Sequence, residues 1–131
     1  MVLVDSDVWS EAFRSKRKSA YVRTLAKLLE AGEVIIVGPI RQEVLSGIRE
    51  ESKYEAIRDA IRAVPSIPLS DELFEKAATY FNLCRSHGIQ GSHTDYLLCA
   101  CATEWDIAIL TKDKDFTRYA TYLPIKLQPI D

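Results

Sequence analysis

The stretch Val2-Leu3-Val4-Asp5-Ser6-Asp7 opens the chain with three aliphatic residues, followed at once by an acid, a hydroxyl and a second acid. An unbroken apolar run is typical of a strand buried on both faces, as in a parallel sheet covered by helices. We expect a helix to follow, with Ser6 or Asp7 as its cap. Because parallel strands end at one edge of a sheet, Asp5 is predicted to lie where open α/β folds bind ligands.

Three more acids stand just beyond an apolar run or open an apolar helix: Glu43, Asp95 and Asp113. The runs at residues 33–37 and 107–110 read as two further buried strands. Carboxylates about 4 Å apart in one crevice repel by roughly 4 kcal/mol per pair at an effective dielectric constant of about 20. Protons or hard divalent cations would neutralise them. The pattern therefore favours a metal-dependent enzyme.

The segments between these runs have helical periodicity and end at glycine or proline. We expect helices at residues 21–31, 39–51, 54–64, 70–87 and 95–105, a helical turn at 116–119, and short extended pieces at 66–69 and 125–127. Ser70 is the expected N-cap of its helix, and Ser92 or Thr94 opens the helix that carries Asp95. This alternation predicts one domain, residues 1–131, with a three-layer α/β/α sandwich and a mostly parallel central sheet.

Composition fits a globular domain, with 47% hydrophobic and 27% charged residues among 131. A net charge of −2 gives no bulk argument for nucleic-acid binding, although local basic clusters such as residues 14–18 would suffice. The ordinary interpretation of those clusters is a solvated helix face. Neither a signal peptide nor an apolar run of membrane-spanning length is visible, so we expect no membrane association.

Three cysteines, an odd number, argue against a disulfide framework. Cys99 and Cys101 are two positions apart on a predicted helix and therefore face different sides, which makes a shared metal site difficult. We expect buried free thiols and a reducing, cytoplasmic setting.

Each acid also has an ordinary structural interpretation. Asp5 and Asp95 suit helix caps or partners of the helix dipole, and Glu43 suits a solvated helix face. We favour capping for Asp7, and we expect His87 and His93 to be surface or helix-start residues. Acids at three separate strand exits, with hydroxyls at Ser6 and Thr111, exceed what capping requires.

The order of these motifs resembles the PIN-domain ribonucleases, and among them the VapC-type toxins of toxin–antitoxin pairs. The resemblance runs from residue 2 to about 127. It rests on Asp5-Ser6-x-Val8-Trp9, on Glu43 after Gly38-Pro39, on Asp95 before a small-residue helix, and on Leu110-Thr111-x-Asp113-x-Asp115-Phe116. Asp7 departs from the family pattern, which more often has a small neutral polar residue there.

The resemblance implies a nuclease whose four acids, Asp5, Glu43, Asp95 and Asp113, bind one or two Mg²⁺ or Mn²⁺ ions and hydrolyse RNA phosphodiester bonds. Ser6, Thr111 and Asp115 match supporting positions. It also implies an antitoxin partner and a homodimer. Five basic residues are candidates for contact with the RNA backbone: Arg14, Lys16, Arg17, Arg41 and Lys112.

Two other functions remain open from the sequence. Asp5-Ser6-Asp7 matches the short motif of haloacid-dehalogenase-like phosphatases, with Asp5 as nucleophile, but a convincing Gly-Asp-x-x-x-Asp segment is missing. A receiver-like, non-catalytic metal-binding regulatory domain would need adjacent acids at the first strand, and here Ser6 separates them. A phosphoaspartate formed on Asp5 would favour the phosphatase.

Overall fold

A three-stranded parallel sheet lies at the centre of the computed structural model, which describes residues 1–130. Strand β1 (Val2–Val4) runs between β2 (Val34–Ile35) and β3 (Ala108–Leu110), in the order β2-β1-β3. Val4 is paired with Leu110, so the residues that follow β1 and β3 leave the sheet side by side. Isolated parallel bridges at Ser66 and Leu127 extend the two outer edges.

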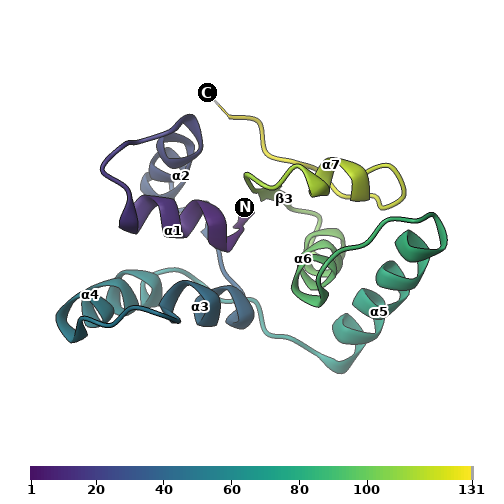
Figure 1. Cartoon of the computed structure of the whole chain (residues 1–131), viewed down its shortest axis with the longest axis horizontal. Coiled ribbons are helices and arrows are strands. Elements are labelled where there is room, and N and C mark those ends of the chain that lie inside the picture. The colour runs from purple at the N-terminus through teal and green to yellow at the C-terminus, as the bar shows by residue number, and fades with distance from the viewer. Residues whose placement is uncertain (131) are drawn as a thin grey trace.

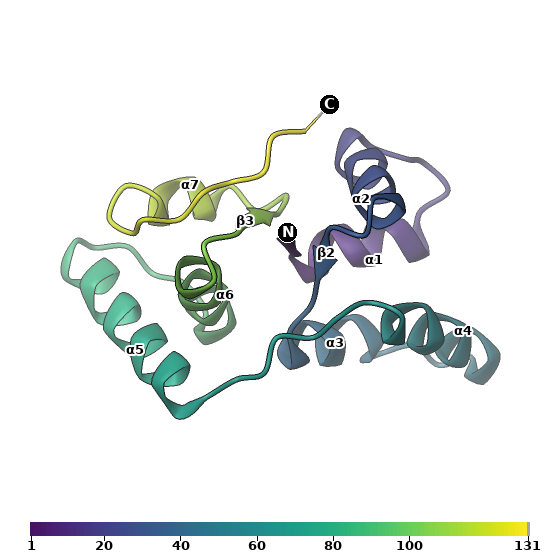
Figure 2. The same ribbon diagram turned by 180° about the vertical axis from the view of Figure 1, so that it is seen from behind.

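Seven helices surround the sheet in the described chain: α1 (Ser6–Arg14), α2 (Ala20–Glu30), α3 (Gly38–Leu45), α4 (Glu51–Arg62), α5 (Asp71–Ser86), α6 (His93–Glu104) and α7 (Asp115–Tyr119). Helices α1 and α2 lie on one side of the sheet, and α6 lies on the other with α5 outside it (Figures 1 and 2). This arrangement confirms the predicted α/β/α sandwich with a parallel sheet.

Several predicted boundaries were wrong. The helix expected at residues 39–51 ends at Leu45, because Ser46 is extended and Gly47 adopts a left-handed conformation with φ of 86°. Helix α4 then begins at Glu51, three residues earlier than expected. The last strand, expected at 125–127, contributes only the single bridge at Leu127, and the extended piece expected at 66–69 pairs only at Ser66, with Ile36 directly after β2. Ser70 is the N-cap of α5, as predicted, and Ser92, one of the two residues that the sequence offered, is the N-cap of α6.

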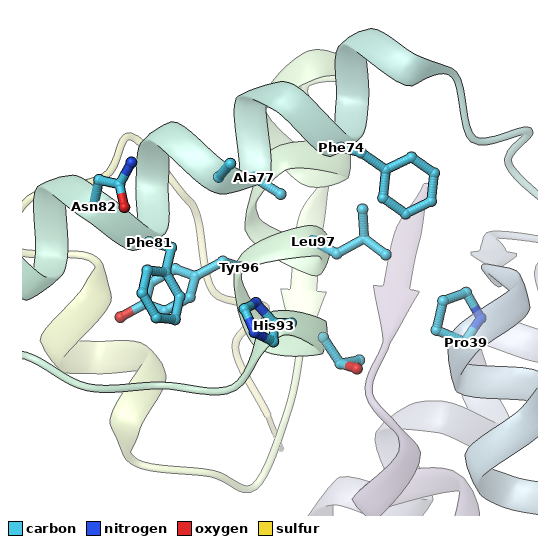
Figure 3. A pocket seen from close by; sticks show the side chains of 10 residues that line it. Pro39, Phe74, Ala77, Phe81, Asn82, His93, Tyr96 and Leu97 are labelled. Carbon is cyan, nitrogen blue, oxygen red and sulfur yellow. The ribbon is translucent and has the colours of Figure 1, made fainter.

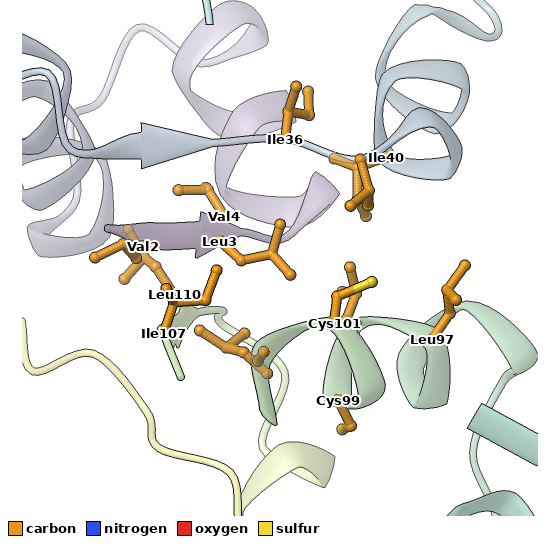
Figure 4. Packing of buried hydrophobic residues seen from close by; sticks show 14 of the residues in the cluster. Val2, Leu3, Val4, Ile36, Ile40, Leu97, Cys99, Cys101, Ile107 and Leu110 are labelled. Carbon is orange, nitrogen blue, oxygen red and sulfur yellow. The ribbon is translucent and has the colours of Figure 1, made fainter. Parts of the chain in front are cut away.

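The core extends over both faces of the sheet, and its most continuous buried stretch is residues 96–102 of α6, which are all buried (Figure 4). A helix that is apolar all round is typical of an element enclosed by neighbours, here the sheet and α5. Cys101 points toward the sheet and Cys99 away from it (Figure 4). Cys84, Cys99 and Cys101 are buried free thiols, as predicted, and burial raises the pKa of Cys101 to about 11.

The helices of the described chain are short compared with the thickness of a bilayer. The longest helix, α5, has 16 residues, and no helix within residues 1–130 is long and apolar enough to cross a bilayer.

Candidate functional site

Asp5 lies at the carboxyl end of the central strand and is itself the N-cap of α1. The expectation that Ser6 or Asp7 would be the cap was wrong, because β1 ends at Val4 and both residues already lie inside the helix. Asp5 Oδ1 accepts a hydrogen bond from the Ser6 N–H at 2.8 Å, and Oδ2 accepts one from the Thr111 hydroxyl at 2.8 Å. Capping and a place at the ligand-binding edge are thus combined in one side chain.

Burial determines the charge state of Asp5, which is only 7% exposed. Desolvation, followed by the nearby charge of Asp7, raises the pKa of Asp5 to about 7, although the bonds from Thr111 and Ser6 oppose that rise. A buried carboxylate that loses its proton near neutrality is stabilised by a neighbouring cation. Asp5 therefore suits an ion-binding position.

The loop after β3 is organised by short side-chain bonds. Thr111 Oγ1 accepts the Asp113 N–H at 3.1 Å, and Asp113 Oδ1 accepts the Asp115 N–H at 2.9 Å. Asp115 begins α7 and its carboxylate lies 3.8 Å from Arg118. Because Thr111 also donates to Asp5, this loop is attached directly to the end of the central strand.

Glu43 joins the same edge from α3. It is exposed, as the ordinary interpretation of a helix glutamate predicts, and its Oε2 accepts a hydrogen bond from the Ser6 hydroxyl at 2.7 Å. Ser6 therefore connects α1 to α3 and places Glu43 over the strand end.

Asp95 enters from the first turn of α6. Its N–H donates to the hydroxyl of the N-cap Ser92 at 3.0 Å, and its Oδ2 accepts the Tyr119 hydroxyl at 2.7 Å. Desolvation raises the pKa of Asp95, the bonds from Tyr119 and Ser92 counteract this, and the charge of Asp113 adds to the rise. Asp95 in turn adds to the raised pKa of Asp5, which places these three acids within electrostatic reach of one another.

Hydrogen bonds and charge effects thus connect the four predicted acids, which come from four different elements or loops. Ser6 bonds to both Asp5 and Glu43, and the charges of Asp95 and Asp113 act on neighbouring acids. Among residues 1–130, however, no group of three or more His, Cys, Asp or Glu side chains forms an arrangement that could hold a metal ion. The described side chains instead hydrogen-bond to Ser6, Thr111 and Tyr119. The atoms that these acids could offer to a metal are all carboxylate oxygens, the ligand type that Mg²⁺ and Mn²⁺ prefer. Mg²⁺ usually keeps several waters and takes few carboxylates directly.

Asp7 has a role that the sequence did not indicate. Its Oδ2 accepts the Lys112 N–H at 3.1 Å, while Oδ1 is buried without a partner in the described structure. Lys112 Nζ forms an ion pair with Glu11, one turn further along α1. Asp7 and Glu11 are four positions apart and therefore lie on the same face of α1. This spacing is the local signal in the sequence that both could contact one residue, here Lys112.

The basic candidates come from α1, from α3, from the loop between α1 and α2, and from the loop after β3. Arg14 donates to the Ser46 carbonyl at 3.4 Å, and Arg41 donates to the Ser66 hydroxyl at 2.9 Å. Lys16 and Arg17 are exposed in the loop between α1 and α2. Lys112 forms an ion pair with Glu11, and this ion pair would compete with binding of Lys112 to an RNA phosphate.

The four acids differ in exposure: Asp5 is buried, Asp95 and Asp113 are half-buried, and Glu43 is exposed. A hollow of about 500 Å³ lies between α5 and α6, with mostly apolar walls that include Phe74, Phe81 and Leu97, and with Pro39 of α3 at one end (Figure 3). The side chains that line it include none of the four acids. Glu43 instead borders a second hollow of about 420 Å³. His93 stacks on Phe81 at the surface, as expected for a helix-start residue.

Comparison with known proteins identifies the class that this fold and this acidic edge define. Residues 2–122 match the PIN domain family, and the chain belongs to that family. Ribonuclease VapC11 of Mycobacterium tuberculosis is 29% identical over 119 residues, covering 88% of this chain and 89% of the relative. This membership sets aside the phosphatase and receiver-like interpretations.

Solved structures agree with the fold at low sequence identity. VapBC2 from Rickettsia felis, bound to a DNA fragment from its promoter, superposes with a TM-score of 0.79 at 15% identity and full coverage of both chains. Mycobacterium tuberculosis VapC20, described as a toxin that cleaves the sarcin-ricin loop, has a TM-score of 0.69 at 19% identity, covering 98% of this chain and 100% of VapC20.

Proposed function

We propose that this chain is a metal-dependent endoribonuclease that hydrolyses RNA phosphodiester bonds as the toxin of a toxin–antitoxin pair, and that residues 1–131 form its single nuclease domain. The observation that carries the proposal is a PIN-domain sheet whose first strand ends at Asp5, a buried acid that is hydrogen-bonded by Ser6 and Thr111 and influenced by the charge of Asp95. Glu43, bound by Ser6, and Asp113, which acts on Asp95, complete the proposed set of four acids. The similarity to VapC11, a protein named as a ribonuclease, supports RNA as the substrate.

Asp5, Asp95 and Asp113 are the proposed ligands of Mg²⁺ or Mn²⁺, directly or through water, and Glu43 is the proposed ligand of a second ion or the residue that orients the attacking water. One or two such ions would activate a water and neutralise charge that builds on the phosphate. The raised pKa of Asp5 supports this assignment, because a buried acid beside other acids is relieved by a cation.

The supporting residues hold the acids in place. The Ser6 N–H and the Thr111 hydroxyl each bind one oxygen of Asp5, so its carboxylate plane is fixed from two sides. The Ser6 hydroxyl holds Glu43, and Asp113 is attached to the N-terminus of α7 through the Asp115 N–H. Preorganised side chains of this kind reduce the reorganisation needed during reaction.

RNA is the proposed polymer, with Arg14, Lys16, Arg17, Arg41 and Lys112 as candidates for its phosphates. These basic side chains would supply sequence-independent affinity for the RNA backbone. The particular RNA is not assigned.

An antitoxin protein, a homodimer and a cytoplasmic setting complete the proposal. The VapBC2 neighbour is bound to a DNA fragment from its promoter, which supports a regulatory complex with a partner protein for this fold. Four apolar or aromatic residues were candidates for antitoxin docking from the sequence: Trp9, Phe13, Tyr54 and Ile57. Trp9 and Ile57 are buried in the core and are therefore unsuited to docking, whereas Phe13 and Tyr54 are only half-buried. The three buried free thiols suit a reducing compartment.

The decisive experiment is cleavage of a mixed RNA pool by purified, partner-free protein with Mg²⁺, with Mn²⁺ and with EDTA. We expect metal-dependent cutting that is lost in Asp5→Asn and Asp95→Asn. Asp106→Asn is the matched control, because Asp106 lies at the other end of β3 and pairs with Lys126. Folded protein that leaves the pool intact in both metals, or equal cutting by the two site variants and the wild type, would contradict the proposal.

A further inference from the structure

Tyr119 connects α7 to the first turn of α6 through one short hydrogen bond. Its hydroxyl donates to Asp95 Oδ2 at 2.7 Å, and its side chain is fully buried. At this distance a phenol and a carboxylate form a strong, charge-assisted bond. The contact fixes one of the two oxygens of Asp95.

The ring of Tyr119 is held in a closely fitting slot. Tyr96 packs against it with ring centroids 4.9 Å apart, and Phe116 meets it edge to face at 5.1 Å. On a third side, a Cβ added at Gly91 would lie 2.2 Å from the Tyr119 hydroxyl oxygen. Residue 91 must therefore be glycine for the phenol to reach Asp95, and the ring has little freedom to move away.

We infer that Tyr119 is a positioning residue that orients the Asp95 carboxylate for a divalent cation, an inference that rests on the proposed ribonuclease function. Ser92 holds the backbone of Asp95 at the helix start, and Tyr119 holds its carboxylate. A donor to one oxygen restricts rotation of the carboxylate, so the other oxygen is held in one direction. Neighbours that orient a ligand in this way typically contribute 10–100-fold, as an order of magnitude, to metal affinity or activity.

A purely structural role makes a different prediction. If Tyr119 served only to attach α7 to α6, its hydroxyl would contribute to unfolding stability and leave the affinity for a cation unchanged. The two roles are separable, because cation binding and thermal unfolding are measured independently.

Tyr96 offers a matched control. It is as deeply buried as Tyr119, packs against the same ring, and is the neighbour of Asp95 in sequence. Its hydroxyl donates to the Ile89 carbonyl at 3.4 Å rather than to a site acid. Tyr96→Phe therefore removes a buried phenol hydroxyl from the same cluster without removing a bond to Asp95.

The test compares Mn²⁺ binding by the full chain, measured from the electron paramagnetic resonance signal of free Mn²⁺, for the wild type, Tyr119→Phe, Gly91→Ala and Tyr96→Phe. Tyr119→Phe deletes the hydroxyl, while Gly91→Ala displaces an intact tyrosine from Asp95. We expect both to weaken Mn²⁺ binding by about 10-fold or more, and Tyr96→Phe to stay within about 2-fold of the wild type. Thermal unfolding in EDTA shows that each variant is folded.

Cleavage of the RNA pool over a range of Mn²⁺ concentrations gives the second readout. We expect the Mn²⁺ concentration for half-maximal cleavage to rise in the two test variants, with much of the rate restored at saturating Mn²⁺. Wild-type Mn²⁺ affinity in both folded variants, or an equal loss in Tyr96→Phe, would overturn the role of Tyr119. A wild type that neither binds Mn²⁺ nor cuts RNA would overturn the proposed function itself, and the inference with it.

Discussion

Asp5 and Thr111 are 106 positions apart in the chain, yet the Thr111 hydroxyl donates to Asp5 Oδ2 at 2.8 Å. The parallel register explains this, because Val4 pairs with Leu110 and the next residue of each strand leaves the sheet at the same level. The Asp5 N–H also donates to the Leu110 carbonyl at 2.9 Å. The end of β1 and the end of β3 thus form one rigid platform for the acidic edge.

The first prediction concerns Thr111, whose hydroxyl serves both Asp5 and the Asp113 N–H. Thr111→Val keeps the shape but removes both bonds, and we expect kcat/KM for RNA cleavage to fall by about 10–100-fold, as for other residues that orient metal ligands. Thr111→Ser retains the hydroxyl and should keep most of the activity. Equal activity of the valine and serine variants would show that the bond is not needed.

The second prediction is that the metal-free protein loses stability as pH rises. The pKa of Asp5 is about 7 in the folded chain and near 3.9 in an unfolded one, so the folded state holds its proton over that interval while the unfolded state has lost it. The stabilisation is fully present below pH 4, declines between about pH 4 and 7, and is at most about 1.4 kcal/mol per pH unit for this group. Asp7 and Asp95 have raised pKa values and act in the same direction, whereas Glu11 has a lowered one and opposes them.

The measurement is the melting temperature in EDTA between pH 4.5 and 8, compared with Asp5→Asn. We expect the variant to show a shallower decline and to exceed the wild type in stability at pH 8. Parallel pH profiles for the two proteins would show that Asp5 titrates normally in the folded state.

The third prediction is that divalent cations stabilise the fold chiefly above the pKa of Asp5. At pH 7.5 a saturating ion, at about 100 times its dissociation constant, adds about 2.7 kcal/mol. At pH 5 protons compete for the same oxygens, so the shift should be much smaller. Calorimetry with and without Mn²⁺ measures both, with Asp5→Asn as the control that should lose most of the shift. A shift of the same size at both pH values would point to an ion bound elsewhere.

The fourth prediction tests the bond between Asp7 and the Lys112 N–H. Asp7→Asn keeps an acceptor oxygen and removes a charge next to Asp5, so we expect its stability to equal or exceed that of the wild type. Asp7→Ala leaves the Lys112 N–H without this acceptor and should cost about 1 kcal/mol. The measurement is the free energy of unfolding of both variants in urea. Equal stability of the two would mean that water replaces the carboxylate as the acceptor for the Lys112 N–H.

The fifth prediction concerns phosphate contacts at the loop between α1 and α2. Lys16→Glu combined with Arg17→Glu should weaken RNA binding and reduce the dependence of affinity on salt, because fewer counterions are released. Lys126→Glu is the control, since Lys126 pairs with Asp106 at the far end of β3. Binding of a catalytically inactive Asp5→Asn protein to RNA at several salt concentrations provides the measurement. An unchanged dependence of RNA affinity on salt concentration would show that Lys16 and Arg17 do not contact the RNA backbone.

Local features of the chain were readable from the sequence because they depend on residues a few positions apart. The buried strand before Asp5, the N-caps at Ser70 and Ser92, and the helix that carries Asp95 each follow from an apolar run or a capping residue. The sequence also predicts that the four acids share one sheet edge, because parallel strands share their carboxyl ends, and their role as one site stays a prediction.

Other relationships depended on tertiary packing. The exit of the chain from β1 made Asp5 the cap in place of Ser6 or Asp7, and freed Asp7 to bind Lys112, 105 positions away. The bond from Tyr119 to Asp95 required α7 to pack on α6 with Gly91 clearing the space between them. The sequence determined by itself the class of fold and the presence of the helices and of the three buried strands, because these follow from local patterns. Only the tertiary structure decided which neighbour holds each carboxylate, because hydrogen-bond partners distant in sequence are selected by packing rather than by local pattern.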